Sequence, residues 1–144
     1  MPIRCIIFNN SLLEWCNKGY DYIGAPWINK PYLLFSYVLV KSGITKALYL
    51  ILKHNIFSAV GNGGISLRKV STFVSVTKQY HPDKSWPANE DFYWSFFAKT
   101  KEKLIKKPRA HEASLFSVEV SPEKIMKQQN YLLPMGIHAW ERYS

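Results

Sequence analysis

The sequence predicts an α/β domain with a mixed sheet flanked by helices, and three observations support this class. Short apolar runs at residues 3–8 and 115–120 have the length and composition of strands. Capping residues and prolines bound helical segments between these runs. The chain has 144 residues, of which 47% are hydrophobic and 20% charged, so it can bury a core and is not intrinsically disordered. We expect one domain over residues 1–144.

The first part of the chain predicts a strand, a short helix and a second strand. Residues 3–8 form a continuous apolar run that is typical of a strand buried on both faces, which would bury Cys5. Ser11 and Glu14 fit a capping box, in which the hydroxyl accepts a bond from a backbone N–H and the carboxylate reaches back. A brief helix follows, and residues 20–24 predict the second strand.

The middle of the chain predicts helices around a glycine-rich segment. Residues 32–53 divide into two apolar stretches because Lys41 and Lys46 interrupt them, so we expect two helices beside the sheet and not a membrane-spanning one. A peripheral contact with a membrane surface is the alternative for this stretch. Residues 58–68 predict a strand, a tight loop and then a strand or a helix start, and residues 69–80 predict a helix.

A signal for the start of a longer helix lies at Asn89. Asparagine is a favoured N-cap, and Glu90 and Asp91 then fall in the first turn, where the helix dipole favours carboxylates. We expect this helix to run to about Lys106, because Pro108 stops it.

The last third of the chain predicts one more strand and little other regular structure. Residues 115–120 alternate between apolar and polar side chains, as a strand does. Residues 125–129 predict a helical turn, and residues 134–140 predict an irregular loop.

The charge and the cysteines limit the choice of partners and compartment. The formal net charge of +9 favours anionic partners, such as nucleotide phosphates, nucleic acid or a membrane surface. We expect no nucleic-acid binding, because the basic residues do not interleave with aromatic residues on one recognisable surface. Cys5 and Cys16 are too few for a disulfide framework, and they predict reduced thiols in an intracellular, cytoplasmic protein.

The strongest local signal for chemistry is the glycine-rich segment. Glycine lets a ligand approach the main chain, and such a segment can present N–H groups to hydroxyls or phosphates. A hairpin turn is an equally good interpretation, because Asn-Gly is a favoured hairpin dipeptide. Ser66 and Arg68 would point the same way along a following strand, and Arg68 could hold an anionic group. The segment consists of Gly61, Asn62, Gly63 and Gly64.

Five further residues could carry chemistry. Glu90 and Asp91 either complement a helix dipole or supply a general base that deprotonates a sugar hydroxyl. His138 is either structural or one ligand of a divalent metal, for which no acidic pair is convincingly placed as a partner. Trp27 and Trp140 either pack in the core, as most tryptophans do, or stack on a sugar face.

Five blocks of sequence occur in an order that resembles a known family. They are YDYIGAPW at residues 20–27, VGNGGISLR at 60–68, NED at 89–91, FSVE at 116–119 and PMGIHAW at 134–140. This set resembles a family of glycosyltransferase-like domains that is catalogued as a domain of unknown function. The family looks similar to the metal-dependent glycosyltransferases of the A-type fold. The resemblance covers almost the whole chain.

The resemblance implies the acceptor-side portion of an A-type glycosyltransferase fold and the transfer of a sugar from a nucleotide-sugar donor to a glycan or other hydroxyl acceptor. By this resemblance, residues 61–64 would line the donor and acceptor cleft, Asp91 would be the catalytic base and Glu90 would orient the acceptor. His138 would bind manganese or magnesium, which would neutralise the leaving diphosphate. The further substrate-binding residues would be Ser66, Arg68, Trp27 and Trp140.

The sequence departs from the family pattern near its start. The family carries a metal-holding Asp after the first strand, where this chain has Ser11, a poor replacement for a carboxylate ligand. The strands that bind the nucleotide are expected to be missing, because the chain starts just before this element. The alternative function is therefore that of an inactive, truncated relative that binds carbohydrate or a protein. In either case we expect residues 61–64, Asp91 and His138 to converge on one site.

Overall fold

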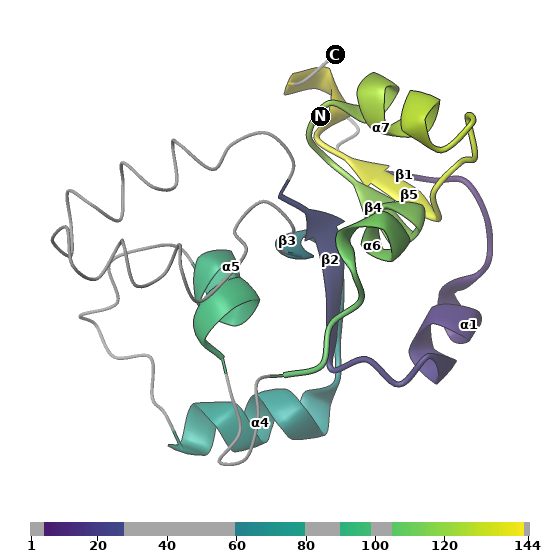
Figure 1. Cartoon of the computed structure of the whole chain (residues 1–144). Coiled ribbons are helices and arrows are strands. Elements are labelled where there is room, and N and C mark those ends of the chain that lie inside the picture. The colour runs from purple at the N-terminus through teal and green to yellow at the C-terminus, as the bar shows by residue number, and fades with distance from the viewer. Residues whose placement is uncertain (1–4, 28–59, 80–89, 99–104, 143–144) are drawn as a thin grey trace, which may run out of the picture.

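Two small sheets and the helices around them form the part of the chain that the structure describes. The expected α/β class, with a mixed sheet and flanking helices, is confirmed (Figure 1). The helices expected in residues 32–53 and the N-cap expected at Asn89 lie outside this part. The structure is a computed structural model, and the residues that it describes are 5–27, 60–79, 90–98 and 105–142.

Helices lie on both sides of the sheets. α1 (Leu12–Asn17) and α4 (Val70–Gln79) confirm two of the predicted helices. The predicted capping box is wrong, because the Ser11 hydroxyl donates to Asn9 Oδ1 and makes no bond to the helix. No described helix is long and apolar enough to cross a bilayer. The other described helices are α5 (Glu90–Phe92), a π-helix (Tyr93–Phe97), α6 (Ala110–Phe116), α7 (Pro122–Gln128) and a 3₁₀ turn (Trp140–Arg142).

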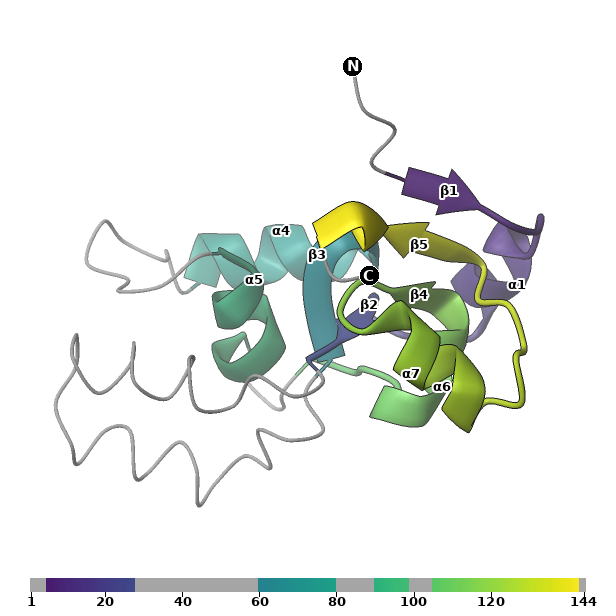
Figure 2. The ribbon, with the colours of Figure 1, turned by 90° about the horizontal axis from the view of Figure 1, so that it is seen from above.

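The first sheet is mixed and has the strand order β1–β5–β4 (Figure 2). β1 (Cys5–Ile7) pairs antiparallel with β5 (Gly136–His138), and β5 pairs in parallel with β4 (Ser117–Val118). The strand expected near the N-terminus is therefore confirmed. Its predicted burial on both faces is wrong: Cys5 and Ile7, which share one face of the strand, are exposed, and Ile6 on the other face is only partly buried.

The C-terminal segments are more regular than expected. Of the strand predicted at residues 115–120, β4 alone is observed, because α6 extends to Phe116, the residue before β4. The irregular loop predicted at residues 134–140 contains β5, which β1 and β4 flank on both sides. Neighbouring strands supply the backbone hydrogen bonds of β5, which the local pattern of residues does not reveal. α7 confirms and lengthens the helical turn expected at residues 125–129.

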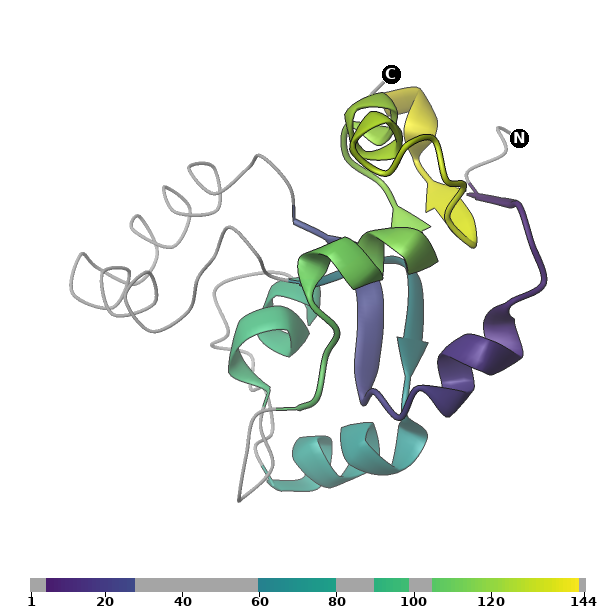
Figure 3. The same cartoon turned by 45° about the vertical axis from the view of Figure 1, so that its right-hand side comes forward.

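The second sheet pairs β2 (Tyr22–Pro26) with β3 (Val60–Arg68) in antiparallel orientation (Figure 3). β2 continues beyond Gly24, where the sequence predicts its end. The tight loop predicted in the glycine-rich segment is also wrong, because β3 runs through this segment as one strand. Pairing with β2 explains both differences, since Ala25 faces Asn62 across the sheet.

A large bulge interrupts the register of the second sheet. Gly24 pairs with Ser66, whereas the next residue, Ala25, pairs with Asn62. One step along β2 therefore corresponds to the interval from Ser66 to Asn62 along β3, and residues 63–65 have no partner in β2. A bulge bends its strand and redirects the residues within it. The glycine-rich segment is therefore the place where β3 leaves regular pairing.

The two faces of the second sheet contribute to two hydrophobic clusters. Tyr22 packs with Val76 of α4 and with Trp94 of the π-helix on one face. Ile23, the next residue, packs with Phe116 of α6 on the other face. Successive residues of a strand point to opposite faces, so one short strand serves both clusters. The second sheet thus lies between the two hydrophobic clusters.

The helix predicted to run to Lys106 ends much earlier. α5 continues into the π-helix, whose last turn is closed by the Ala98 N–H donating to Tyr93 O at 3.0 Å. Lys106 lies outside any helix, and its backbone N–H donates to Asp21 Oδ2 at 2.8 Å. The acceptor comes from a residue far away in the sequence, so the local helix signals do not predict that Lys106 lies outside the helix.

A largely buried lysine supports the π-helix. Lys107 Nζ donates to the carbonyl oxygens of Trp94, at 3.3 Å, and of Ser95. Burial lowers the pKa of Lys107 to about 8. A neutral amine still carries two N–H donors, so both carbonyls can keep their partner after deprotonation. The Lys107 amine thus contributes to holding the π-helix that follows Asp91.

The stability of the chain should therefore depend on pH through Lys107. An unfolded lysine keeps its ordinary pKa of 10.5, so between about pH 8 and 10.5 the unfolded chain binds more protons than the folded chain. The free energy of unfolding should rise with pH across this window, by at most about 3 kcal/mol. Urea unfolding of the wild type and Lys107→Met measures this. The free energy of unfolding of the wild type minus that of Lys107→Met should increase with pH across this window. A difference that stays constant or decreases contradicts the prediction.

Candidate functional site

Two ionisable side chains lie against consecutive glycines of the bulge. A Cβ atom on Gly63 would overlap the carboxylate of Asp91, and one on Gly64 would overlap the imidazole of His138. Any larger residue at either position would displace the group that packs there. The structure therefore brings together the glycine-rich segment, the start of α5 and the end of β5, which we call the diglycine cluster. Its members are Gly63, Gly64, Asp91, Glu119 and His138.

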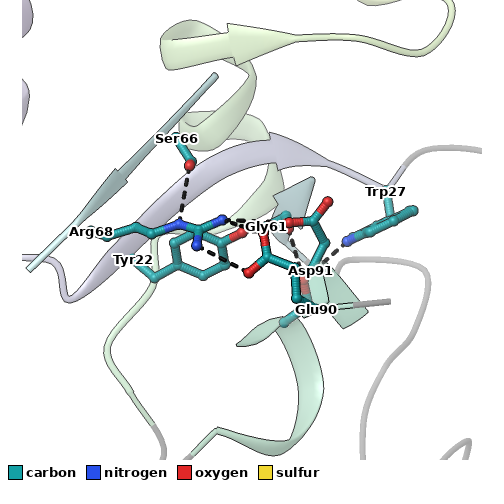
Figure 4. A network of polar contacts seen from close by, with 8 residues as sticks. Tyr22, Trp27, Gly61, Ser66, Arg68, Glu90 and Asp91 are labelled. Carbon is teal, nitrogen blue, oxygen red and sulfur yellow. Dashed lines mark hydrogen bonds and ion pairs between the residues drawn. The ribbon is translucent and has the colours of Figure 1, made fainter. Parts of the chain in front are cut away.

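The backbone before the bulge is held by a short hydrogen-bond chain. Gly61 has a φ of 132°, which side-chain-bearing residues rarely adopt. Its carbonyl oxygen accepts from Tyr22 Oη at 2.7 Å and from Ser95 Oγ at 3.1 Å. Trp27 Nε1 donates to the same Ser95 hydroxyl at 3.1 Å (Figure 4). Trp27 is thus hydrogen-bonded to the π-helix through its ring nitrogen. Asn62, the residue after Gly61, is buried.

The Arg68 guanidinium faces the acidic pair at the start of α5. Its two terminal nitrogens donate to the two oxygens of Glu90 at 3.1 and 3.0 Å, and one of them lies 3.6 Å from Asp91 Oδ1 (Figure 4). Its Nε donates to Ser66 Oγ at 3.3 Å, and its carbon lies 5.5 Å from the Tyr22 ring centroid. Arg68, predicted to hold an anionic group, therefore holds Glu90 in this structure.

The two adjacent carboxylates have opposite pKa shifts. Burial raises the pKa of Asp91, with help from the charges of Glu90 and Glu119, and these effects outweigh the Gly63 N–H bond and Arg68. The two-point bond from Arg68 lowers the pKa of Glu90. Pairs of carboxylates whose environments separate their pKa values are suited to different chemical roles. Asp91 is the better proton acceptor of the two, and Glu90 is the fixed anion.

Glu119 faces His138 across the first sheet. Its Oε2 lies 3.3 Å from His138 Nδ1, a contact short enough for an ion pair. Both atoms are buried, and neither has a hydrogen-bond partner in the described structure. Sequence reasoning missed Glu119, because the block that contains it carries no mark of a role. Its place beside His138 arises from the parallel pairing of β4 and β5, which no local pattern encodes.

The residue at the expected carboxylate position lies away from His138. The Asn9 side chain, which accepts from the Ser11 hydroxyl, donates to Pro134 O, and Phe8 N–H donates to Met135 O at 2.9 Å. β1 pairs with His138 at its other end, through Cys5. Cys5 and Phe8 are three residues apart, which corresponds to about 10 Å along a strand. Within the described residues, no group of three or more His, Cys, Asp or Glu side chains is arranged to hold a metal.

Trp140 lies outside the diglycine cluster. It lines an apolar hollow of about 340 Å³ together with residues of β1, β5 and α7, including Phe8, Met126 and Ile137. None of the hollow's lining residues belongs to the cluster. The structure therefore does not bring Trp140 to the acidic pair, whereas Trp27 is linked to it through the π-helix.

A double-mutant cycle should reveal the packing of His138 on Gly64. Gly64→Ala should destabilise the wild-type chain by about 1–3 kcal/mol, because the new methyl group forces the ring to move. The same substitution in a His138→Ala background should cost much less, because the space is then vacant. Urea unfolding of the four proteins measures the coupling. Equal costs in the two backgrounds would show that the ring does not pack on Gly64.

Comparison with known proteins gives a family and no activity. No curated protein and no solved structure matches the chain. One family model matches residues 3–138, a span that contains every member of the diglycine cluster. The expected membership of a family of unknown function is confirmed, and its likeness to glycosyltransferases stays a prediction. The chain belongs to the family described as protein of unknown function, DUF5672.

Proposed function

We propose that this chain is a glycosyltransferase-like domain that transfers a sugar from a nucleotide-sugar donor to a hydroxyl acceptor. One observation carries the proposal: Asp91 and His138 meet at consecutive glycines of a bulged strand. Such a place brings a proton acceptor and a possible nitrogen ligand together on a glycine backbone, a combination that metal-assisted sugar transfer can use. The resemblance of the ordered sequence blocks to glycosyltransferases supports the same reading.

Asp91 is the proposed general base. Its raised pKa makes its carboxylate a stronger proton acceptor than an exposed aspartate. In the proposed step, Asp91 takes the proton of the acceptor hydroxyl while the hydroxyl oxygen bonds to the anomeric carbon of the donor. The bond from that carbon to the diphosphate oxygen breaks, and the nucleoside diphosphate leaves with the electron pair. The proton ends on Asp91, so atoms and charge balance.

Glu90 is the proposed acceptor-orienting residue. Both of its oxygens bond to Arg68, and each retains a lone pair that can accept from a second hydroxyl of the acceptor. Its side chain is 62% exposed, so an acceptor can reach it. Arg68 then acts as the support of Glu90 and as a counter-charge near Asp91, at 3.6 Å.

His138 is the proposed protein ligand of a divalent cation. Magnesium-type sites use one or two carboxylates and fill their other positions with substrate phosphates and water, so an imidazole is a weak ligand for such a cation and Ser11 adds nothing to it. A manganese or magnesium ion there would neutralise charge on the leaving diphosphate. The described residues supply no group of three ligands, so we expect the cation to bind with the nucleotide and only weakly alone.

Donor binding and turnover test this proposal separately. Calorimetric titration of the full chain with uridine- and guanosine-diphosphate sugars, with and without manganese, should reveal one donor that binds better with the metal. Asp91→Asn should keep donor binding within about threefold and lower turnover by about 10²–10⁴-fold, because it removes only the base. Glu14→Gln, the same change at an exposed carboxylate, should alter neither.

The outcomes separate the alternatives. Metal-assisted donor binding without turnover by the wild type would favour the inactive, carbohydrate-binding alternative, in keeping with the place of Ser11 away from His138. Turnover that survives Asp91→Asn would remove Asp91 from its role. Binding of no nucleotide sugar by the folded chain would overturn the proposal.

A further inference from the structure

We propose that Glu119 is a positioning residue that fixes the proton of His138 on Nδ1 and thereby leaves Nε2 as the ring nitrogen with a free lone pair for a ligand. The inference deepens the proposed function, and it rests on that function only for the statement that a ligand meets Nε2. The proton position is a property of the chain itself and can be measured without any ligand.

The register of the first sheet creates the pair. β4 and β5 run in parallel, with Ser117 facing Gly136 and Val118 facing Ile137. The next residues along the two strands are Glu119 and His138. Side chains at matching positions of neighbouring strands lie on the same side of a sheet, so the carboxylate and the imidazole project together. The 3.3 Å separation of Glu119 Oε2 and His138 Nδ1 follows from this register.

In the described structure, the buried Nδ1 atom has an ion-pair contact with Glu119 and no hydrogen bond. The Nδ1 atom is buried, although the His138 side chain as a whole is 23% exposed, so its exposed area lies on the rest of the side chain. The ring packs on Gly64, whose missing side chain provides the space that the imidazole fills. Glu119 Oε2 is equally buried, and the Glu119 side chain is only 12% exposed.

An unpaired buried donor or acceptor carries the full cost of its lost hydration. The 3.3 Å contact is an ion-pair distance without hydrogen-bond geometry. A carboxylate oxygen can only accept, so a proton on Nδ1 is the arrangement in which a small rotation of the ring gives both atoms a partner. This holds for the neutral ring and for the protonated ring alike. In the neutral ring the other nitrogen, Nε2, then keeps its lone pair free for a cation or a hydroxyl.

A carboxylate behind a ligating histidine is a recurrent device. It fixes the tautomer and the ring orientation, and its loss commonly weakens metal binding by about 10–100-fold. Glu119 also lies close enough to Asp91 for its charge to contribute to the raised pKa of that base. Glu119 thus interacts with both ionisable side chains of the diglycine cluster that lie on the glycines.

Nitrogen NMR of the full chain tests the proposal directly. Long-range proton–nitrogen correlation spectra of protein labelled with ¹⁵N-histidine distinguish the two tautomers, and His138→Gln identifies the signals of this ring among the four histidines. The spectra are recorded without metal or nucleotide, at a pH where the nitrogen shifts show a neutral ring. The wild type should carry its proton on Nδ1. A proton on Nε2 in the folded wild type would overturn the proposal, and this result needs no variant.

Three variants separate positioning from general structure. Glu119→Leu removes the acceptor and should give mixed tautomers, whereas Glu119→Gln keeps an acceptor oxygen and should restore the Nδ1 proton. Glu123→Leu, a matched change at an exposed carboxylate, should leave the wild-type tautomer. A tautomer that is the same in folded Glu119→Leu and in the wild type would contradict the role of Glu119.

Metal binding tells this proposal apart from the proposed function. Manganese titrated in the presence of uridine diphosphate should bind about 10–100-fold more weakly to Glu119→Leu than to the wild type, with Glu119→Gln between them. If the wild type has the Nδ1 proton but binds neither metal nor nucleotide, the proposed function fails and the assignment of Glu119 stands. If metal and donor bind while the proton sits on Nε2, the reverse is true.

Discussion

The bulge in the second sheet is the constraint on which the candidate site depends. β2 and β3 keep a regular register from Tyr22 to Gly24 and shift it between Gly24 and Ala25, so residues 63–65 are left outside the ladder; a second shift follows between Ala25 and Pro26. Because the first two of these residues are glycines, a carboxylate and an imidazole can lie directly on the strand's backbone. Regular pairing would place β2 opposite these residues, and larger residues would fill the space with their own side chains.

Other contacts hold the groups that face the bulge. Asp91 sits at the start of a short α-helix that continues as a π-helix, and Lys107 bonds to two carbonyls of that π-helix. Tyr22 and Ser95 share the carbonyl of Gly61, so the backbone before the bulge and the π-helix are fastened to each other. π-Helical turns are rare and often lie at functional sites, which agrees with the place of this one.

The charges of the site form an ordered arrangement around Asp91. Arg68 neutralises Glu90 through two bonds and leaves Asp91 at a longer distance, while burial and the neighbouring carboxylates keep Asp91 basic. Glu119 takes part twice, as a neighbouring charge for Asp91 and as the partner of His138. In this chain, an aspartate with a raised pKa, a glutamate anchored by arginine and an imidazole beside a second carboxylate therefore occupy adjacent positions.

The sequence alone determined the class of the fold, the helices at α1, α4 and α7, and the choice of glycine, carboxylate and histidine for the site. These features depend on local composition and periodicity, which a single sequence contains. Only the tertiary structure decided that β3 passes through the glycines without turning, that β5 is a strand and that Glu119 stands beside His138. The same holds for Lys106, whose backbone N–H donates to Asp21 and which lies outside the helix that the sequence predicts there. Each of these features depends on a partner distant in the sequence, and strand pairing and side-chain acceptors of this kind leave no trace in the local pattern of residues.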